Sequence, residues 1–94
     1  MPVYIMALVP GQTKEGYDQV MSALRPLLDQ ADGFIAHGAA SSPEGWRVFE
    51  LWESRQQATD FFATYIHPNL PPGITPQRTY LELHNLMVGG RTQA

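Results

Sequence analysis

Two ionisable side chains, His37 and Glu50, interrupt apolar, strand-like segments of the sequence. A neutral imidazole in a pocket can take a proton from a phenol near neutral pH, which predicts His37 as a general base. A carboxylate is costly to bury alone, so Glu50 must pair with a histidine or an arginine or reach water. We therefore predict His37 and Glu50 as a catalytic pair. The alternatives are a hydrogen-bonded structural histidine and a salt bridge of Glu50 at a dimer interface.

Whether His37 and Glu50 can contact each other depends on the register of the strands that carry them. One register places His37 opposite Glu50 and Ile35 opposite Trp52. A slip by a single residue turns His37 to the other face of the sheet. The sequence leaves both registers open.

Five further side chains are candidates for substrate binding: Trp52, Phe62, Tyr65, His67 and His84. The Trp52 indole offers a flat wall to an aromatic ligand, although a tryptophan before a helix cap also fits a hydrophobic core. Tyr65 and His67 end a helix beside a proline-rich loop, where they either gate a cleft or cap the helix. His84 and Asn85 point to opposite faces of the last strand, so only one of them can enter a given pocket.

Aromatic density on the predicted helices places the pocket between the sheet and the helices. The rings of Tyr17, Phe61, Phe62 and Tyr65 are expected to face Trp52 across this pocket. The proline-rich loop after the second helix borders the same pocket. Such a lining favours a flat, apolar ligand, so we expect a small aromatic molecule as the partner.

Metal and nucleotide chemistry find no support in the sequence. The three histidines lie 30 and 17 positions apart, so no helical pair supplies ready-made ligands, and the chain has no cysteine. The eight glycines are scattered at turns and form no phosphate-binding loop. We expect no metal site and no cofactor.

The rest of the chain is expected to fold around a strand at 46–54. Alternation gives this strand two faces, one with Trp46, Val48, Glu50 and Trp52, the other with Arg47, Phe49, Leu51 and Glu53. Both faces are largely apolar, which is typical of a central strand that is covered on both sides. Ser54 followed by Gln57 forms a capping box, so a helix to about Ile66 should follow directly.

The remaining segments complete a β-α-β-β-α-β order. Strands are predicted at 3–9, 34–40 and 79–88, a hairpin turn at 41–45, and a helix from about Lys14 to Gln30 capped by Thr13. Pro26 should kink or loosen the last turn of that first helix.

This order predicts an α+β, ferredoxin-like fold in a single domain, residues 1–94, with a frayed tail at 88–94. Right-handed crossovers predict the first and third strands at the centre of the sheet, parallel to each other, with both helices on one face. Nothing in the 94 residues is left to cover the other face. We therefore expect a homodimer that packs the helix-free faces of two sheets together.

Composition and charge exclude several classes of protein. A hydrophobic content of 44% excludes disorder, and no apolar run approaches the ~18 residues of a membrane span. A net charge of -3 without a cluster of basic residues argues against a nucleic-acid partner. The first residues lack the charged region of a signal peptide, so a soluble, cytoplasmic protein is the default expectation.

Several stretches of the sequence form a recognisable pattern. They are Gly-Phe-Ile-Ala-His-Gly at 33–38, Gly-Trp-Arg-Val-Phe-Glu-Leu-Trp-Glu-Ser at 45–54, Phe-Phe at 61–62, Ile-His-Pro-Asn-Leu at 66–70 and Glu-Leu-His-Asn at 82–85. This pattern resembles the antibiotic-biosynthesis-monooxygenase-like (ABM) group of dimeric α/β-barrel proteins. The resemblance implies that fold along nearly the whole chain.

The group includes cofactor-independent oxygenases of polycyclic phenols, quinol oxygenases, haem-degrading enzymes and proteins without known activity. The haem-degrading members are similar in using an Asn on the first strand and a His on the second helix. Here residues 3–9 contain no Asn, and His67 is the only helix-associated histidine. The phenol oxygenases gather Trp, Tyr, Asn, His and Arg in a cleft, and Trp52 matches the tryptophan of their strand-to-helix motif.

The resemblance implies a small cofactor-independent monooxygenase-like protein, an oxidoreductase that acts on an aromatic or polyketide-type molecule. Without flavin or metal, a carbanion formed by deprotonating the substrate would itself have to reduce oxygen, while the protein supplies a base and excludes water. One alternative is a non-oxidative cyclase or isomerase that uses the same base. Another is a non-catalytic dimer that binds a small molecule or is purely structural.

Overall fold

The computed structural model describes residues 1–89, which form a four-stranded sheet and two α-helices. The strands are β1 (Val3–Val9), β2 (Phe34–Ser42), β3 (Gly45–Trp52) and β4 (Gln77–Glu82). The helices are α1 (Lys14–Asp29) and α2 (Arg55–Phe61), and α2 continues into a π-helical turn (Phe62–Ile66) and a 3₁₀ turn (His67–Asn69). This arrangement confirms the expected α+β, ferredoxin-like fold.

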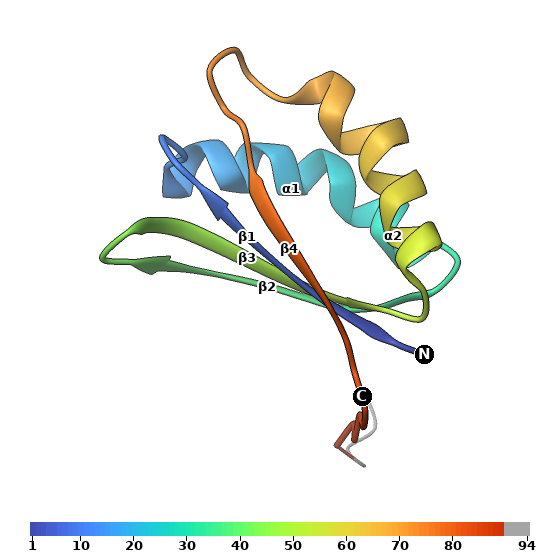
Figure 1. The fold of residues 1–94 in the computed structure, drawn as a ribbon. Helices are drawn as coiled ribbons and strands as arrows, with labels where there is room; N and C mark the ends of the chain where they lie inside the picture. Colours follow the sequence, from blue (N-terminus) through green and yellow to red (C-terminus); the bar gives the residue numbers. More distant parts are fainter. Residues whose placement is uncertain (90–94) are drawn as a thin grey trace.

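The sheet has the strand order β2-β3-β1-β4, and every neighbouring pair of strands is antiparallel. The first and third strands are central as expected, but the expected parallel pairing between them is wrong. The crossover through α1 makes β1 and β2 parallel, and the tight hairpin after β2 reverses the chain. Strand β3 therefore enters between β1 and β2 in the opposite direction (Figure 1).

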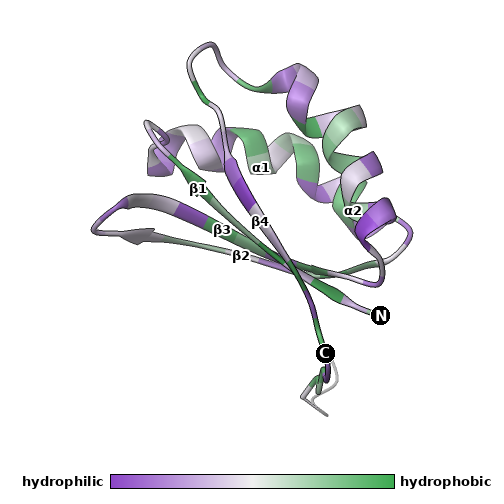
Figure 2. Ribbon diagram, in the orientation of Figure 1, coloured by the Kyte–Doolittle hydropathy of each residue, from purple (hydrophilic) through white to green (hydrophobic). Residues whose placement is uncertain are grey.

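Both helices lie on the same face of the sheet, and no helix of the described residues lies on the opposite face (Figure 1). The buried core on the helix side consists of Val3, Ile5, Leu28, Trp52, Ala58 and Phe61. Strand β1 alternates between buried and half-buried residues, because only one of its faces is covered within the chain. Apolar residues concentrate in the central strands and on the inner sides of the helices (Figure 2). No helix among residues 1–89 is long and apolar enough to cross a membrane.

Local signals set the ends of both helices. The Thr13 hydroxyl accepts a hydrogen bond from the Gly16 N–H at 3.0 Å, which confirms the predicted cap of α1. Pro26 does not stop this helix, which continues to Asp29. Its last turn is anchored on the sheet side by the buried Leu28.

Helix α2 is shorter than predicted, although its predicted start is confirmed. The Ser54 hydroxyl accepts a hydrogen bond from the Gln57 N–H at 3.2 Å. Regular α-helix ends at Phe61, where a wider π-helical turn follows in place of the helix predicted to Ile66. Pro68 contributes to this irregular end, because it lacks the N–H that a continuing α-helix would need.

Strand β4 runs from Gln77 to Glu82, so the predicted extension to Val88 is wrong. Its partner β1 begins at Val3, which pairs with Glu82, and only the Leu83 N–H finds a further acceptor, the Pro2 carbonyl at 2.8 Å. Between Leu83 and Gly89 the chain pairs with no other strand of residues 1–89. The predicted tail at 88–94 lies outside the described residues from Gly90 onward.

Candidate functional site

The hairpin register of β2 and β3 places His37 opposite Glu50. The other half of the expected register is wrong, because Phe34 rather than Ile35 lies opposite Trp52. A bulge between Phe34 and Ala36 inserts one extra residue on β2 and shifts the pairing there. The bulge lies on the far side of His37 from the turn, so it leaves the His37–Glu50 pair in place.

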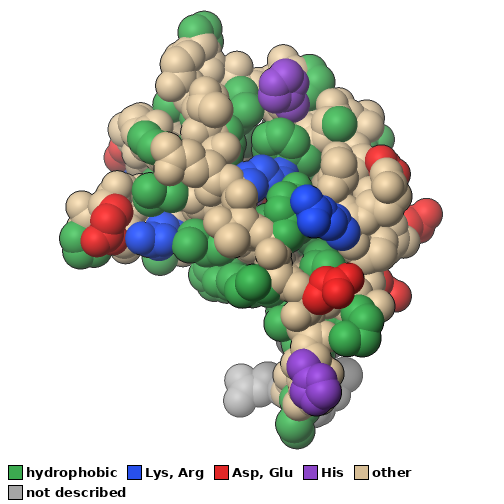
Figure 3. Space-filling model, viewed as in Figure 1, with side chains coloured by type: hydrophobic (Ala, Val, Ile, Leu, Met, Phe, Trp, Pro, Cys, Tyr) green, Lys and Arg blue, Asp and Glu red, His purple; other side chains and the backbone are tan. Residues whose placement is uncertain are grey.

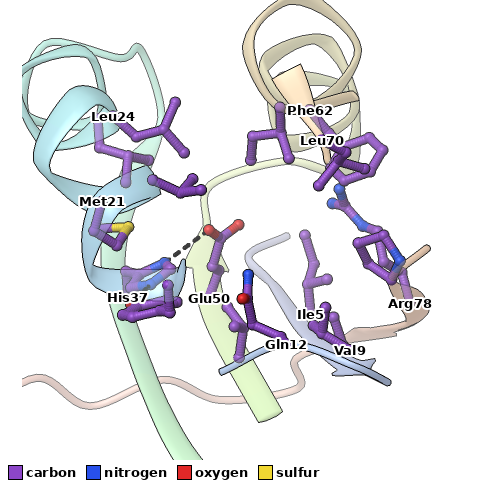
Figure 4. Close-up of a pocket in the computed structure, with 17 residues that line it drawn as sticks. Ile5, Val9, Gln12, Met21, Leu24, His37, Glu50, Phe62, Leu70 and Arg78 are labelled. Atoms are coloured by element: carbon purple, nitrogen blue, oxygen red, sulfur yellow. Dashed lines mark hydrogen bonds and ion pairs between the residues drawn. The ribbon is translucent and has the colours of Figure 1, made fainter. Parts of the chain in front are cut away.

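His37 is hydrogen-bonded through both of its ring nitrogens. Its Nδ1 lies 2.8 Å from Glu50 Oε2 (Figure 4), and its Nε2 lies 2.5 Å from the Tyr17 hydroxyl. A carboxylate can only accept, so Nδ1 carries the imidazole proton and Nε2 accepts from Tyr17. The result is a chain of hydrogen bonds from α1 through β2 to β3.

Glu50 is a buried carboxylate with only 7% of its surface exposed. Burial by itself raises the pKa of Glu50, but the hydrogen bonds from His37 and Trp52, together with the nearby charge of Arg78, outweigh burial and hold the pKa below its ordinary value. The Trp52 indole N–H donates to Glu50 Oε1 at 2.9 Å. Both carboxylate oxygens are thus occupied, which keeps Glu50 ionised and oriented.

Tyr17 lies against His37 from the helix side. The two rings are nearly parallel at 15°, with centroids 6.0 Å apart, and the Trp46 ring lies 5.2 Å from Tyr17 on another side. Burial, with the nearby negative charges of Glu50 and Asp18, raises the pKa of Tyr17 to about 12. Tyr17 is therefore a neutral phenol at physiological pH and donates its proton to His37.

A cavity of about 90 Å³ lies between the sheet and the helices, beside this chain of hydrogen bonds. Its apolar lining includes Ile5, Val9, Met21, Leu24, Phe62 and Leu70. Its polar lining consists of Gln12, Tyr17, His37, Glu50 and Arg78. Figure 4 shows Glu50 pointing up between the helices, with His37 and Met21 on one side and Arg78 on the other.

Arg78 places a cation on the side of the cavity opposite His37 (Figure 4). Its guanidinium carbon lies 3.9 Å from the centre of the Phe62 ring, a cation–π contact. Burial lowers the pKa of Arg78, while Tyr80 and Glu50 act in the opposite direction. An arginine nevertheless stays charged, so the cavity has an anionic and a cationic side chain on different walls.

Three of the polar side chains in this cavity, Gln12, Tyr17 and Arg78, were not among the predicted site residues. Gln12 and Arg78 were not singled out, and Tyr17 was expected only as an aromatic ring facing Trp52. The alternation of Arg78 with Tyr80 was the available signal for Arg78, but the strand was predicted to begin after it, at Thr79. No sequence signal links Tyr17 to His37, because they lie on a helix and a strand 20 positions apart.

The predicted site residues fall into separate places. His37, Glu50 and Phe62 line the cavity, whereas Trp52 is 1% exposed because Phe34 and Phe61 cover its ring.

The other three predicted residues lie away from the cavity. Tyr65 packs on Phe61, and 38% of its surface is exposed. His67 is exposed in a different hollow under the proline-rich loop, and His84 is exposed beyond the end of β4.

No protein-family model and no curated protein sequence matches the chain. Solved structures do match its fold. SnoaB, a cofactor-independent oxygenase from Streptomyces nogalater, is 12% identical, with a TM-score of 0.57 over 92% of this chain and 94% of that chain. Rv0793 from Mycobacterium tuberculosis is 16% identical, with a TM-score of 0.60 over 94% of this chain and 100% of that chain.

The haem-degrader MhuD from Mycobacterium tuberculosis, solved with two haems bound in its active site, also matches the fold. It is 18% identical, with a TM-score of 0.60 over 95% of this chain and 100% of that chain. At such identities the likeness is one of fold. The resemblance to the ABM group is confirmed at that level.

As the structure shows them, His37 and His67 offer no ligand to a haem iron in the cavity. Both ring nitrogens of His37 are engaged by Tyr17 and Glu50, and His67 lies in a hollow that His37 does not line. Neither imidazole therefore offers a free nitrogen to the cavity. Residues 1–89 also contain no group of three or more His, Asp and Glu side chains that could hold a metal ion.

Proposed function

We propose that this chain is a cofactor-independent monooxygenase that oxidises a phenolic or polyketide-type small molecule. The observation that carries the proposal is the hydrogen-bonded series Tyr17–His37–Glu50 in the wall of an apolar cavity. The fold shared with SnoaB, a cofactor-independent oxygenase, supports the same class of chemistry.

His37 is the base in this proposal. Glu50 accepts the Nδ1 proton, which leaves the lone pair of Nε2 as the site that takes a proton. The positive charge that then forms on the imidazole is stabilised by the adjacent carboxylate. Because Glu50 is buried and held by two donors, its charge acts on His37 with little screening by water.

The apolar lining has a separate role in the reaction. Deprotonation of a phenol that is the enol tautomer of an acidic methylene gives an anion with carbanion character, which transfers an electron to molecular oxygen and then recombines with the reduced oxygen to form a peroxide. Loss of water from that peroxide leaves a carbonyl, so CH₂ and O₂ become C=O and H₂O. A cavity without bulk water protects the carbanion from reprotonation. Arg78 lies where it can stabilise negative charge on oxygen.

Oxygen uptake tests the proposal directly. A tricyclic anthrone, which has phenolic hydroxyls and an acidic methylene, is incubated with the protein in an oxygen electrode, and the product is analysed after labelling with ¹⁸O₂. We expect enzyme-dependent uptake of one O₂ per substrate and one labelled oxygen atom in the product. Uptake should fall in His37→Ala and persist in Glu44→Gln, which changes an exposed carboxylate on the hairpin, away from the cavity.

The other outcomes identify the alternatives. Conversion of the substrate without oxygen uptake would replace the oxygenase by a cyclase or isomerase. Binding without conversion would leave a small-molecule-binding protein, and neither binding nor conversion would remove the proposal.

We also propose that two copies pack through the helix-free faces of their sheets. Two large apolar side chains on this face are exposed, Phe49 by 43% and Leu81 by 57%, and Tyr4, Met6 and Leu8 are half-buried. Phe49 lies across Gly38 on the neighbouring strand, where any side chain would collide with its ring. Figure 3, which views the sheet from the side as in Figure 1, shows hydrophobic side chains along the lower side of the sheet, where no helix of residues 1–89 lies. An exposed sheet face with several large apolar side chains favours a matching apolar partner.

A further inference from the structure

Two hollows meet at Tyr17 and His37. The first is the interior cavity beside Glu50, and the second is a wide groove of about 990 Å³ between α1 and the edge strand β2. Four side chains belong to both linings: Tyr17, Met21, Leu28 and His37. These side chains form the partition between the groove and the cavity.

The sizes of the two hollows show why this partition matters. Sites for small molecules usually enclose about 300–1,000 Å³. The cavity of about 90 Å³ is too small for a bicyclic or tricyclic ligand, whereas the groove is large enough but lacks the apolar enclosure. A ligand of that size can reach His37 from within an enclosed site only if the partition moves.

Tyr17 is the member of the partition that holds His37. Its ring is nearly parallel to the imidazole, with the centroids 6.0 Å apart, and its hydroxyl occupies Nε2, the nitrogen that must be free to act as a base. Among the described residues, the hydroxyl has this single hydrogen-bond partner. Tyr17 lies in the first turn of α1 and is only half-buried, so its side chain can turn toward solvent without unfolding the helix.

We propose that Tyr17 is a displaceable cover over His37, and that the ligand enters from the groove between α1 and β2 and replaces the Tyr17 phenol with its own hydroxyl. This inference rests on the proposed function in one respect, that the ligand is a phenol. In the covered state Tyr17 occupies the place of the substrate, a phenol whose O–H points at the base. The space vacated by its ring enlarges the cavity on the side of the groove.

This exchange makes the site selective for a hydroxyl. A phenol that displaces Tyr17 restores the hydrogen bond to Nε2, so the imidazole stays paired. A methyl ether of the same shape has no proton to donate and leaves Nε2 unpaired in a buried site, which is unfavourable. The competing hydrogen bond of Tyr17 also weakens ligand binding, because the protein must first leave its covered state.

The rate at which diethyl pyrocarbonate acylates His37 reports how well Tyr17 covers Nε2, and it needs no enzymatic assay. The reagent modifies free imidazole nitrogens, and peptide mass spectrometry separates His37 from the exposed His84, which serves as an internal reference. We expect slow modification of His37 in the wild type. In Tyr17→Phe, which loses only the hydrogen bond, modification of His37 should be faster by roughly 2- to 12-fold. The matched control is Tyr4→Phe, which removes a hydroxyl from the opposite face of the sheet and should change nothing at His37.

The ligand half of the proposal is tested with 2-naphthol and its methyl ether, 2-methoxynaphthalene. We expect 2-naphthol to protect His37 in the wild type and to do so at lower concentration in Tyr17→Phe, while the ether protects poorly in both. Equal rates of His37 modification in the wild type and Tyr17→Phe would contradict the proposal that the Tyr17 hydroxyl covers His37. Equal protection by phenol and ether would overturn the exchange of hydroxyls. If Tyr17→Phe does not fold, the comparison of the two ligands on the wild type still decides the exchange.

These readouts are independent of oxygenase activity. Protection of His37 by 2-naphthol in a protein that consumes no oxygen with any phenol would support the displaceable cover and contradict the proposed function. Oxygen uptake by the wild type, together with an unchanged rate of His37 modification in Tyr17→Phe, would support the proposed function and contradict the displaceable cover.

Discussion

The indole N–H of Trp52 donates to the same carboxylate, that of Glu50, that accepts from His37. Trp52 thus buries its ring in the core and uses its one polar atom to hold the buried charge beside the cavity. Its influence on a ligand passes through Glu50, because the indole itself does not line the cavity. The relationship ties the stability of the core to the orientation of the proposed base.

Replacing Trp52 by Phe should destabilise the protein by about 1–3 kcal/mol from the lost hydrogen bond to a buried charge, in addition to the loss of ring volume. Urea denaturation measures this change. Trp46→Phe is the matched control, because the Trp46 indole N–H is buried without a hydrogen-bond partner among the described residues. A loss of stability in Trp46→Phe as large as that in Trp52→Phe would mean that the bond to Glu50 contributes little.

Glu50 should make the stability of the protein depend on acid pH. Its pKa is lower in the folded chain than the unfolded value of about 4.3, so folding favours the ionised form. This contribution is fully present above pH ~4.3 and is lost as the pH falls through the folded-state pKa. The free energy of unfolding of Glu50→Gln should therefore approach that of the wild type as the pH falls. A difference that stays constant from pH 7 to pH 3 would exclude this linkage.

Tyr17 should ionise at a higher pH in the folded protein than a tyrosine in water does. Its pKa is raised to about 12, and a raised acid pKa means that folding favours the neutral phenol. The resulting stabilisation is present below pH ~10 and decreases as the pH rises from there toward the folded-state value. Titration of the phenolate absorbance should show one late step that is absent in Tyr17→Phe. Loss of a different step in that variant would refute the assignment.

Removal of the imidazole distinguishes the chemical from the structural role of His37. If His37 is the base, His37→Ala should reduce the oxidation rate by about 10²–10⁴-fold, while Glu50→Gln, which keeps the base, should reduce it less. Added imidazole should restore part of the rate in His37→Ala. Thermal unfolding of the same variant is measured in parallel. A variant that keeps its activity but loses stability would identify His37 as a structural histidine.

The proposed dimer depends on the exposed apolar face around Phe49. A charge at this position is costly to bury, so Phe49→Lys should shift the mass measured by light scattering from two chains to one at micromolar concentration. Lys14→Glu, on the first turn of α1 and away from this face, is the control and should leave the mass of two chains. A monomeric wild type would end the proposal.

The sequence by itself determined the local features of this protein. The alternation in β3 predicted which side chains share a face, and the caps at Thr13 and Ser54 predicted where the helices begin. Alternation follows from the geometry of a single strand, and a cap involves residues within one turn. The pairing of His37 with Glu50 was predicted as one of two registers, because both registers satisfy the same local pattern.

Only the tertiary structure decided what lies between elements. The antiparallel direction of β3 against β1, the bulge after Phe34 and the end of β4 at Glu82 depend on which strands become neighbours. The same holds for the bond from Tyr17 to His37, since a helix residue meets a strand residue only after the helix has packed on the sheet. Contacts between residues distant in sequence depend on the packing of whole elements. The local sequence pattern around one residue therefore does not indicate its distant partner.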